Sequence, residues 1–148
     1  GDALFSGNKL FGGFGIRSDK EFYQNIEFGS FNKKLEEIVY CDLVDPHFYH
    51  LDTCFCPLNE SHGLWWPAAF SKKTQQAMKE KLQLFAVPEH EAHKFACNAI
   101  VVGKNVVIPA GCPETAKFLM TQGFEVHACE MQEFIKAGGA CKCLVLYI

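Results

Sequence analysis

Apolar positions in this chain fall into short runs that are separated by turn residues and amphipathic stretches. The apolar runs predict strands at residues 3–6, 9–14, 38–43, 49–58, 84–87, 99–102, 105–109, 124–128 and 143–148, with a further apolar run at 63–70. Helical periodicity and capping residues predict helices at about residues 19–25, 71–82, 89–95, 113–122 and 131–137. The order strand–strand–helix–strand therefore recurs about three times, at a spacing of roughly 45 to 55 residues, which indicates an α/β repeat architecture.

Composition places the chain among globular proteins, because 49% of its residues are hydrophobic and 21% are charged. No linker divides it, so residues 1–148 are interpreted as a single domain. The formal net charge of -3, without a basic block, gives no indication of a nucleic-acid partner. The apolar runs are shorter than the roughly 18 residues of a membrane span. The chain opens abruptly, without Met or a signal peptide, so we expect an N-terminal truncation of a cytoplasmic protein.

Eight cysteines raise the question of disulfides or metal binding. Most of them lie within or beside apolar, strand-like runs, whereas a disulfide scaffold places them in loops. We therefore expect reduced, buried thiols. A zinc-binding module is an alternative from another class of protein, because Cys54-x-Cys56 and Cys141-x-Cys143 could supply four thiolates. Their one-residue spacer is shorter than is usual for such sites.

The first candidate for chemistry is the segment His50-Leu51-Asp52-Thr53-Cys54-Phe55-Cys56. Read as a strand, it places His50, Asp52, Cys54 and Cys56 on one face, because residues two apart share a face. A titratable base and a carboxylate on one face can form the wall of a reactive site. A solvated polar face is the alternative, although the flanking aromatic residues favour burial.

The second candidate is Gly138-Gly139-Ala140-Cys141-Lys142-Cys143, which precedes Leu144-Val145-Leu146. Two glycines allow a tight turn, and a cysteine that enters the following strand would be accessible as a nucleophile if a base lay nearby. The third candidate is Arg17 in Gly15-Ile16-Arg17-Ser18, just before an expected capping box that runs from Ser18 to Glu21. An arginine there could bind a carboxylate with two hydrogen bonds.

Taken together, these segments resemble the guanidine-modifying superfamily of arginine deiminases, dimethylarginine hydrolases and amidinotransferases. The segment Tyr49-His50-Leu51-Asp52-Thr53 is similar to the catalytic-histidine segment of that group. Gly138-Gly139-x-x-x-Cys143-Leu144-x-Leu146 is similar to its nucleophile motif. Gly1-Asp2-Ala3-Leu4, Gly15-Ile16-Arg17-Ser18 and Cys97-Asn98-Ala99 resemble three further segments of the family. All five occur in the family's order over nearly the whole chain.

The resemblance implies a β/α propeller of five modules, of which about three fit here, as the C-terminal portion. It implies that the thiolate of Cys143 attacks a guanidinium carbon, that His50 transfers protons, and that Asp52, Arg17 and Asn98 bind an arginine-like substrate, with no cofactor or metal. Water as the second nucleophile would make a hydrolase, and an amine would make an amidinotransferase. The family's other guanidinium-binding carboxylates would precede residue 1. Weak turnover, or a non-catalytic remnant that only assembles, is therefore the alternative.

The same reasoning predicts a homo-oligomer. Three modules of a closed propeller leave two flanks whose apolar faces lack neighbours, and exposed sheet edges and apolar patches are association sites.

Overall fold

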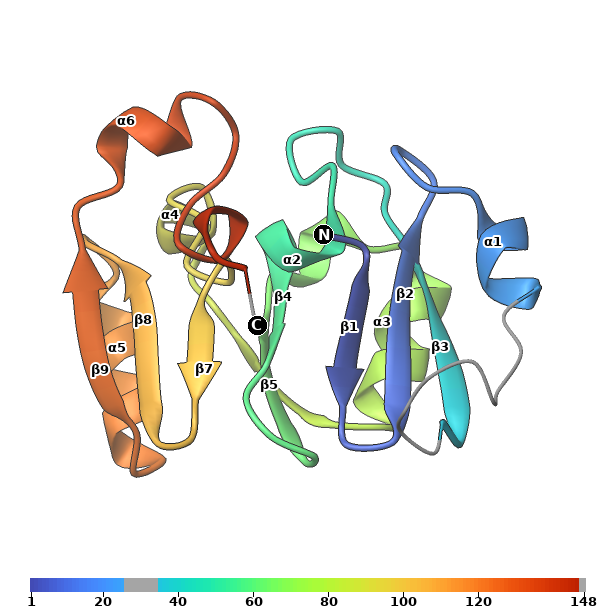
Figure 1. The fold of residues 1–148 in the computed structure, drawn as a ribbon, viewed down its shortest axis with the longest axis horizontal. Coiled ribbons are helices and arrows are strands. Elements are labelled where there is room, and N and C mark those ends of the chain that lie inside the picture. Colours follow the sequence, from blue (N-terminus) through green and yellow to red (C-terminus); the bar gives the residue numbers. More distant parts are fainter. Residues whose placement is uncertain (26–34, 147–148) are drawn as a thin grey trace.

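Each third of the chain folds into a three-stranded sheet with the same connections. The computed structural model describes residues 1–25 and 35–146. In each sheet, two antiparallel strands form a hairpin, and a third strand pairs with the second in parallel (Figure 1). A crossover brings the chain back to that third strand, as parallel pairing requires. The sheets start at Ala3, Phe55 and Ile100, which confirms the predicted repeat.

The first module consists of β1 (Ala3–Ser6), β2 (Lys9–Phe14), α1 (Lys20–Gln24) and β3 (Glu37–Asp42). The second follows a short helix, α2 (Leu51–Cys54), and consists of β4 (Phe55–Pro57), β5 (His62–Trp65), the 3-10 turn η1 (Pro67–Ala69), α3 (Lys72–Lys79) and β6 (Gln83–Ala86). The third begins after α4 (Glu89–Ala92) and consists of β7 (Ile100–Val102), β8 (Asn105–Pro109), α5 (Pro113–Thr121) and β9 (Glu125–Cys129). The chain continues through α6 (Gln132–Ile135) and the 3-10 turn η2 (Lys142–Leu144).

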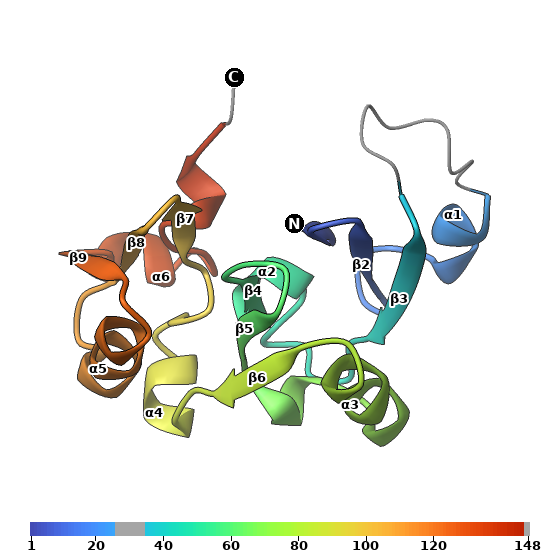
Figure 2. The same ribbon diagram turned by 90° about the horizontal axis from the view of Figure 1, so that it is seen from below.

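The three sheets stand side by side in an arc (Figure 2). Helices α3 and α5 lie on the outer side of the arc, and the C-terminal segment lies on its inner side. The chain is thus a partial β/α propeller. The first strand of each sheet lines one cavity of about 610 Å³, whose walls include Leu4, Cys56, Val101 and Lys142. This cavity therefore joins residues of all three modules.

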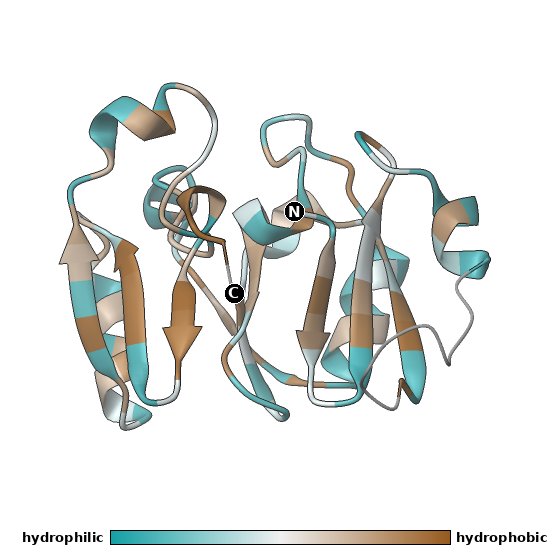
Figure 3. Ribbon diagram, in the orientation of Figure 1, coloured by the Kyte–Doolittle hydropathy of each residue, from teal (hydrophilic) through white to brown (hydrophobic). Residues whose placement is uncertain are grey.

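One large apolar core runs through the three modules, from Leu4 to Cys141. The strands carry most of the apolar colour in Figure 3, and the helices show polar faces. All eight cysteines are free, and the expected burial is confirmed for six; Cys129 and Cys143 are exposed. Within the described residues, no helix is long and apolar enough to cross a membrane.

The prediction of a strand over 49–58 is wrong in its first half. Residues Leu51–Cys54 form α2, and of the predicted strand only Phe55–Pro57 pair in a sheet. His50, Asp52, Cys54 and Cys56 therefore do not share a strand face. The first turn of α2 is stabilised by distant partners, because Leu51 N donates to Asp2 Oδ1 at 2.8 Å and Asp52 N donates to Gly1 O at 3.0 Å. These partners lie far away in the sequence, so the local alternation of polar and apolar residues wrongly predicted a strand.

Two other expectations at the chain ends are also corrected. Ser18 does not cap α1: the N-cap residue is Asp19, and the Ser18 hydroxyl donates to Asp2 Oδ2 at 2.7 Å. Residues Lys142–Leu144 form η2, so the strand expected from residue 143 is absent from the described part of the tail. Residues 147 and 148 of that prediction lie outside the described residues.

Candidate active site

The N-terminus, α2 and the C-terminal turn η2 gather at one end of the inner strands (Figure 1). His50 is the N-cap residue of α2, with extended backbone, and its carbonyl accepts from Thr53 N and Thr53 Oγ1. Gly1 packs against its ring so closely that a Cβ at residue 1 would lie 2.6 Å from His50 Nδ1. The imidazole is therefore half-buried between the N-terminal segment and the Tyr49 ring, whose centroid is 4.8 Å away.

Asn98 connects α2 to the C-terminal turn. Its amide nitrogen donates to Asp52 O at 3.0 Å and to Cys143 Sγ at 3.2 Å. Its amide oxygen accepts from Ala140 N at 3.0 Å and from Cys143 N at 3.3 Å. Since the side chain is fully buried and its donors and acceptor sites are engaged, Asn98 fixes where Cys143 stands relative to α2.

The structure distinguishes Cys141 from Cys143 by their burial. In the sequence the two stand two positions apart, so strand alternation could not distinguish them. Cys141 is buried, and burial raises the pKa of its thiol to about 11, so it stays protonated near neutral pH. Cys143 is exposed, and its sulfur receives the Asn98 amide. A Cβ on Gly139 would lie 3.1 Å from Cys143 Sγ, so only glycine leaves the sulfur ordinary space there. Of the two, Cys143 has the accessible thiol that a nucleophile needs.

Asp52 is buried, and its Oδ1 is the one fully buried side-chain oxygen or nitrogen of the described residues that has no hydrogen-bond partner. Burial raises the pKa of this carboxyl, while nearby positive groups, among them His50 and Lys142, oppose that change. Both His50 and Lys142, the residue before Cys143, are thus close enough to act electrostatically on the Asp52 carboxylate. An unpartnered buried carboxylate is costly unless a cation or donor arrives.

Arg17 is exposed, and its guanidinium lies over the Tyr49 ring at 5.7 Å from the centroid. The neighbouring Ser18 hydroxyl donates to Asp2, whose other oxygen accepts from the first turn of α2. The buried carboxylate of Asp2 therefore connects the Arg17 segment with the His50 segment. Sequence reasoning assigned no site role to Asp2 or Tyr49. Both could have been suspected from their positions in family-like segments, Asp2 in Gly1-Asp2-Ala3-Leu4 and Tyr49 directly before His50.

The four thiols of the zinc alternative do not come together. Cys54 and Cys56 are buried and direct their sulfurs toward backbone carbonyls, among them Leu51 O and Ala99 O. Among the described residues, the group with metal-ligand spacing is a different one, His90, Glu91 and Glu114, whose ligand atoms lie within 4.8 Å of one another.

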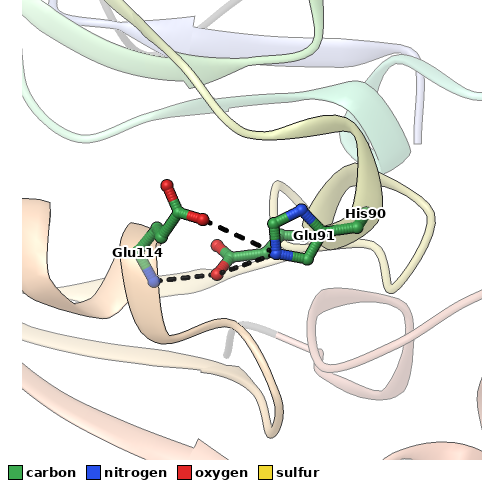
Figure 4. A group of neighbouring side chains, drawn as sticks. All are labelled: His90, Glu91 and Glu114. Atoms are coloured by element: carbon green, nitrogen blue, oxygen red, sulfur yellow. Dashed lines mark hydrogen bonds and ion pairs between the residues drawn. The ribbon is translucent and has the colours of Figure 1, made fainter.

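That group is explained by helix capping (Figure 4). Glu91 is fully buried, and its carboxylate accepts from Glu114 N at 2.8 Å, from Thr115 N at 2.9 Å and from Thr115 Oγ1 at 2.6 Å. It therefore satisfies the free N–H groups at the start of α5. His90 and Glu114 are both exposed and form an ion pair at 3.7 Å when the histidine is protonated.

Several curated proteins resemble the chain. An uncharacterized protein of Caenorhabditis elegans is 45% identical over 99% of this chain and 52% of its own length. The bifunctional arginine dihydrolase/ornithine cyclodeaminase ArgZ of Synechocystis is 37% identical over 100% of this chain and 21% of that protein. The dimethylarginine dimethylaminohydrolase of Mycobacterium tuberculosis is 33% identical over 100% of this chain and 48% of that enzyme. The chain thus spans about half the length of these relatives, or less. No family model matches it.

Solved structures show the same fold. The N-terminal domain of ArgZ bound to its product superposes with a TM-score of 0.90 and 36% identity, over 99% of this chain and 54% of that domain. An Asn-to-Ser variant of that domain, covalently bound to a reaction intermediate, gives a TM-score of 0.89 and 36% identity, over 97% of this chain and 53% of the variant. By fold and by sequence, the chain belongs to the guanidine-modifying, or pentein, superfamily, together with the arginine dihydrolases and the dimethylarginine dimethylaminohydrolases.

Proposed function

We propose that this chain carries the nucleophile, the general acid–base and one substrate carboxylate of a guanidine hydrolase that acts on an arginine-like substrate. The observation that carries the proposal is Asp52 Oδ1, a buried acceptor without a donor, beside His50. A planar guanidinium offers N–H donors and a positive charge, which together complement such an oxygen. Asp52 would then bind the cation that Cys143 attacks.

Relatives support the choice of substrate class. ArgZ is named an arginine dihydrolase, and its N-terminal domain has been captured with product and with a covalent intermediate. A cysteine-to-serine mutant of that domain holds substrate. The Mycobacterium relative is named for hydrolysis of dimethylarginine. A covalent route through a cysteine therefore fits both the relatives and the exposed thiol of Cys143.

The proposed reaction has two halves. The Cys143 thiolate forms a bond to the guanidinium carbon, and the C–N bond to one terminal nitrogen breaks as His50 gives that nitrogen a proton. This leaves an N-alkyl amidino group on sulfur, with the rest of the substrate still attached. His50 then takes a proton from water, the resulting hydroxide adds to the same carbon, and the C–S bond breaks to release a ureido product and regenerate the thiolate. Amidino transfer would need the bond to the alkyl-substituted nitrogen to break instead, so that the bare amidino group on sulfur passes to an acceptor amine.

Two further residues complete the proposed site. Arg17, exposed at the rim, would pair with the α-carboxylate of the substrate. Asn98 was placed among the substrate-binding residues by resemblance, but its side-chain hydrogen bonds are already engaged within the protein. We therefore assign it a positioning role, in which it holds the Cys143 sulfur and the α2 backbone together.

The proposal is tested with a haloacetamidine label and with turnover. The label is expected on Cys143, mapped by mass spectrometry, and Cys143→Ser should abolish both labelling and citrulline release from arginine or methylarginine. Cys141→Ser is the matched control, since its thiol is buried, and it should keep both. Labelling of Cys141 with Cys143 untouched would refute the assignment. Adding an acceptor amine distinguishes hydrolysis from amidino transfer.

We also propose that the chain self-associates. Large apolar side chains are exposed at Val102, Leu144, Val145 and Leu146, the last 83% exposed. Exposed apolar side chains of this size favour association in water. Sedimentation should show a dimer or larger species that Leu146→Glu weakens, and a monomer at high concentration would contradict the proposal.

A further inference from the structure

Tyr49 contacts three parts of the candidate site that come from different regions of the chain. Its hydroxyl donates to Gly138 O at 2.9 Å, across 89 positions of sequence. Its ring lies beneath the Arg17 guanidinium, 5.7 Å from centroid to Cζ, and beside the His50 ring at 4.8 Å. The side chain is half-buried, so these contacts are partly shielded from water.

The hydroxyl bond holds the turn that precedes Cys143. Gly138 has a φ of +89°, in the left-handed region, and a Cβ there would lie 3.1 Å from the Tyr49 ring. The segment from Gly138 to Cys143 is otherwise held from its other side, where Asn98 accepts from Ala140 N and Cys143 N. Tyr49 and Asn98 thus hold the two ends of this segment. Without the hydroxyl, one end loses its side-chain contact.

The ring serves a different partner. An exposed arginine side chain has many rotamers, and stacking on an aromatic face favours those that point toward the ring. Because Tyr49 immediately precedes His50, the same ring aims Arg17 toward the histidine segment. The distance between the residue proposed to hold the substrate carboxylate and the residues proposed to act on its guanidinium is thereby set by one side chain.

We infer that Tyr49 is a positioning residue with two separable functions: its hydroxyl places the Cys143 segment, and its ring places Arg17. The inference rests on the proposed function, because it assigns Tyr49 to the same site. It concerns geometry rather than chemistry, since Tyr49 has no part in bond making or proton transfer.

The two functions are separated by two variants. Tyr49→Phe keeps the ring and removes the hydroxyl, so kcat should fall about 10-fold through misplacement of the nucleophile, while KM for arginine stays unchanged. Tyr49→Leu removes both, so KM for arginine should also rise, about 2- to 5-fold. The KM for agmatine, which lacks the carboxylate, should not rise in either variant. Tyr40→Phe, a tyrosine outside the site, is the matched control and should behave as the parent.

Two readouts do not need turnover. Hydrogen exchange of the segment around Gly138 should accelerate in both Tyr49 variants, and haloacetamidine labelling of Cys143 should slow. Arginine binding to Cys143→Ser, measured by calorimetry, should weaken in Tyr49→Leu and not in Tyr49→Phe. Unchanged exchange and labelling in Tyr49→Phe would overturn the hydroxyl function, and equal weakening of arginine and agmatine would overturn the ring function. The wild-type chain could fail to modify any guanidine while hydrogen exchange and Cys143 labelling still change as expected in Tyr49→Phe. In that case the proposed function fails and the hydroxyl function stands.

Discussion

Two buried carboxylates in this molecule have opposite surroundings. Glu91 is fully buried, and both of its oxygens accept hydrogen bonds at the start of α5. Asp52 is also buried, at 5% exposure, yet its Oδ1 has no donor. Glu91 is satisfied by the fold, whereas Asp52 keeps a buried oxygen for which the described residues supply no hydrogen-bond donor. A buried acid with its donors in place indicates structure, and one without them indicates a ligand.

The largest expected difference between the two carboxylates is in activity. Asp52→Asn should lower kcat/KM for arginine about 100-fold or more, because an amide lacks the charge that a guanidinium needs. Glu91→Gln should keep kcat/KM near the parent value at a temperature where it is folded. Citrulline release measures both. The contrast would collapse if Asp52→Asn turned over arginine as fast as the parent.

The next largest effect concerns stability. Glu91→Ala removes the acceptor of three donors at the start of α5, so the free energy of unfolding should fall by about 3 kcal/mol. Thr115→Val is a milder companion that removes only the hydroxyl donor, and it should cost less. Urea denaturation followed by circular dichroism measures these changes. A loss below about 0.5 kcal/mol for Glu91→Ala would show that the cap contributes little.

Asp52→Asn should raise the free energy of unfolding, by about 1 kcal/mol near neutral pH, whereas Glu91→Ala lowers it. Burial raises the pKa of Asp52, so the folded state keeps a proton that the unfolded state has lost. The free energy of unfolding contributed by this group is therefore present at low pH and is lost as pH rises from the ordinary carboxyl range through the raised pKa. Urea midpoints measured at a series of pH values, from the ordinary carboxyl range upward, should show that decline in the parent and a flatter profile in Asp52→Asn.

The smallest expected effect is the response to ligand. Arginine at about three times its dissociation constant should stabilise the Cys143→Ser protein by about 0.8 kcal/mol, because only the folded state binds it. The same addition should leave the Asp52→Asn, Cys143→Ser double variant nearly unchanged, and should stabilise a Glu91→Gln, Cys143→Ser variant normally. Thermal melts report the shift. Equal stabilisation of all three would place the cation elsewhere.

The repeat was predictable because its signals are local. Turn residues such as Gly7-Asn8 and Gly103-Lys104 and the helix-capping Ser71 lie within each module, and Ser71 Oγ does accept from Thr74 N. Pattern alone could therefore identify three strand–strand–helix–strand units. His50, Asp52 and Cys143 were also singled out in advance, the first two through a strand alternation that α2 does not have. Asn98 was added through motif resemblance alone.

The predictions that were wrong concern segments whose structure depends on contacts with distant parts of the chain. Helix α2 has four residues, and its first N–H groups are satisfied by Gly1 and Asp2, about fifty positions away. The expected C-terminal strand lacks a pairing partner among the described residues, so Val145 is extended without belonging to a sheet. The Ser18 hydroxyl likewise donates to Asp2, and it does not cap α1. In each case tertiary bonding overrode the local preference.

The order of contacts along the chain has a kinetic consequence. Each sheet closes within its own module, whereas the bonds that assemble the site join residues 46 and 89 positions apart, from Asn98 to Asp52 and from Tyr49 to Gly138. Distant pairs close later than near ones, because the entropy lost on closure grows with the length of the loop. During refolding, the far-ultraviolet signal of the modules should therefore return first, and the capacity of Cys143 to accept a haloacetamidine label should return in a later phase.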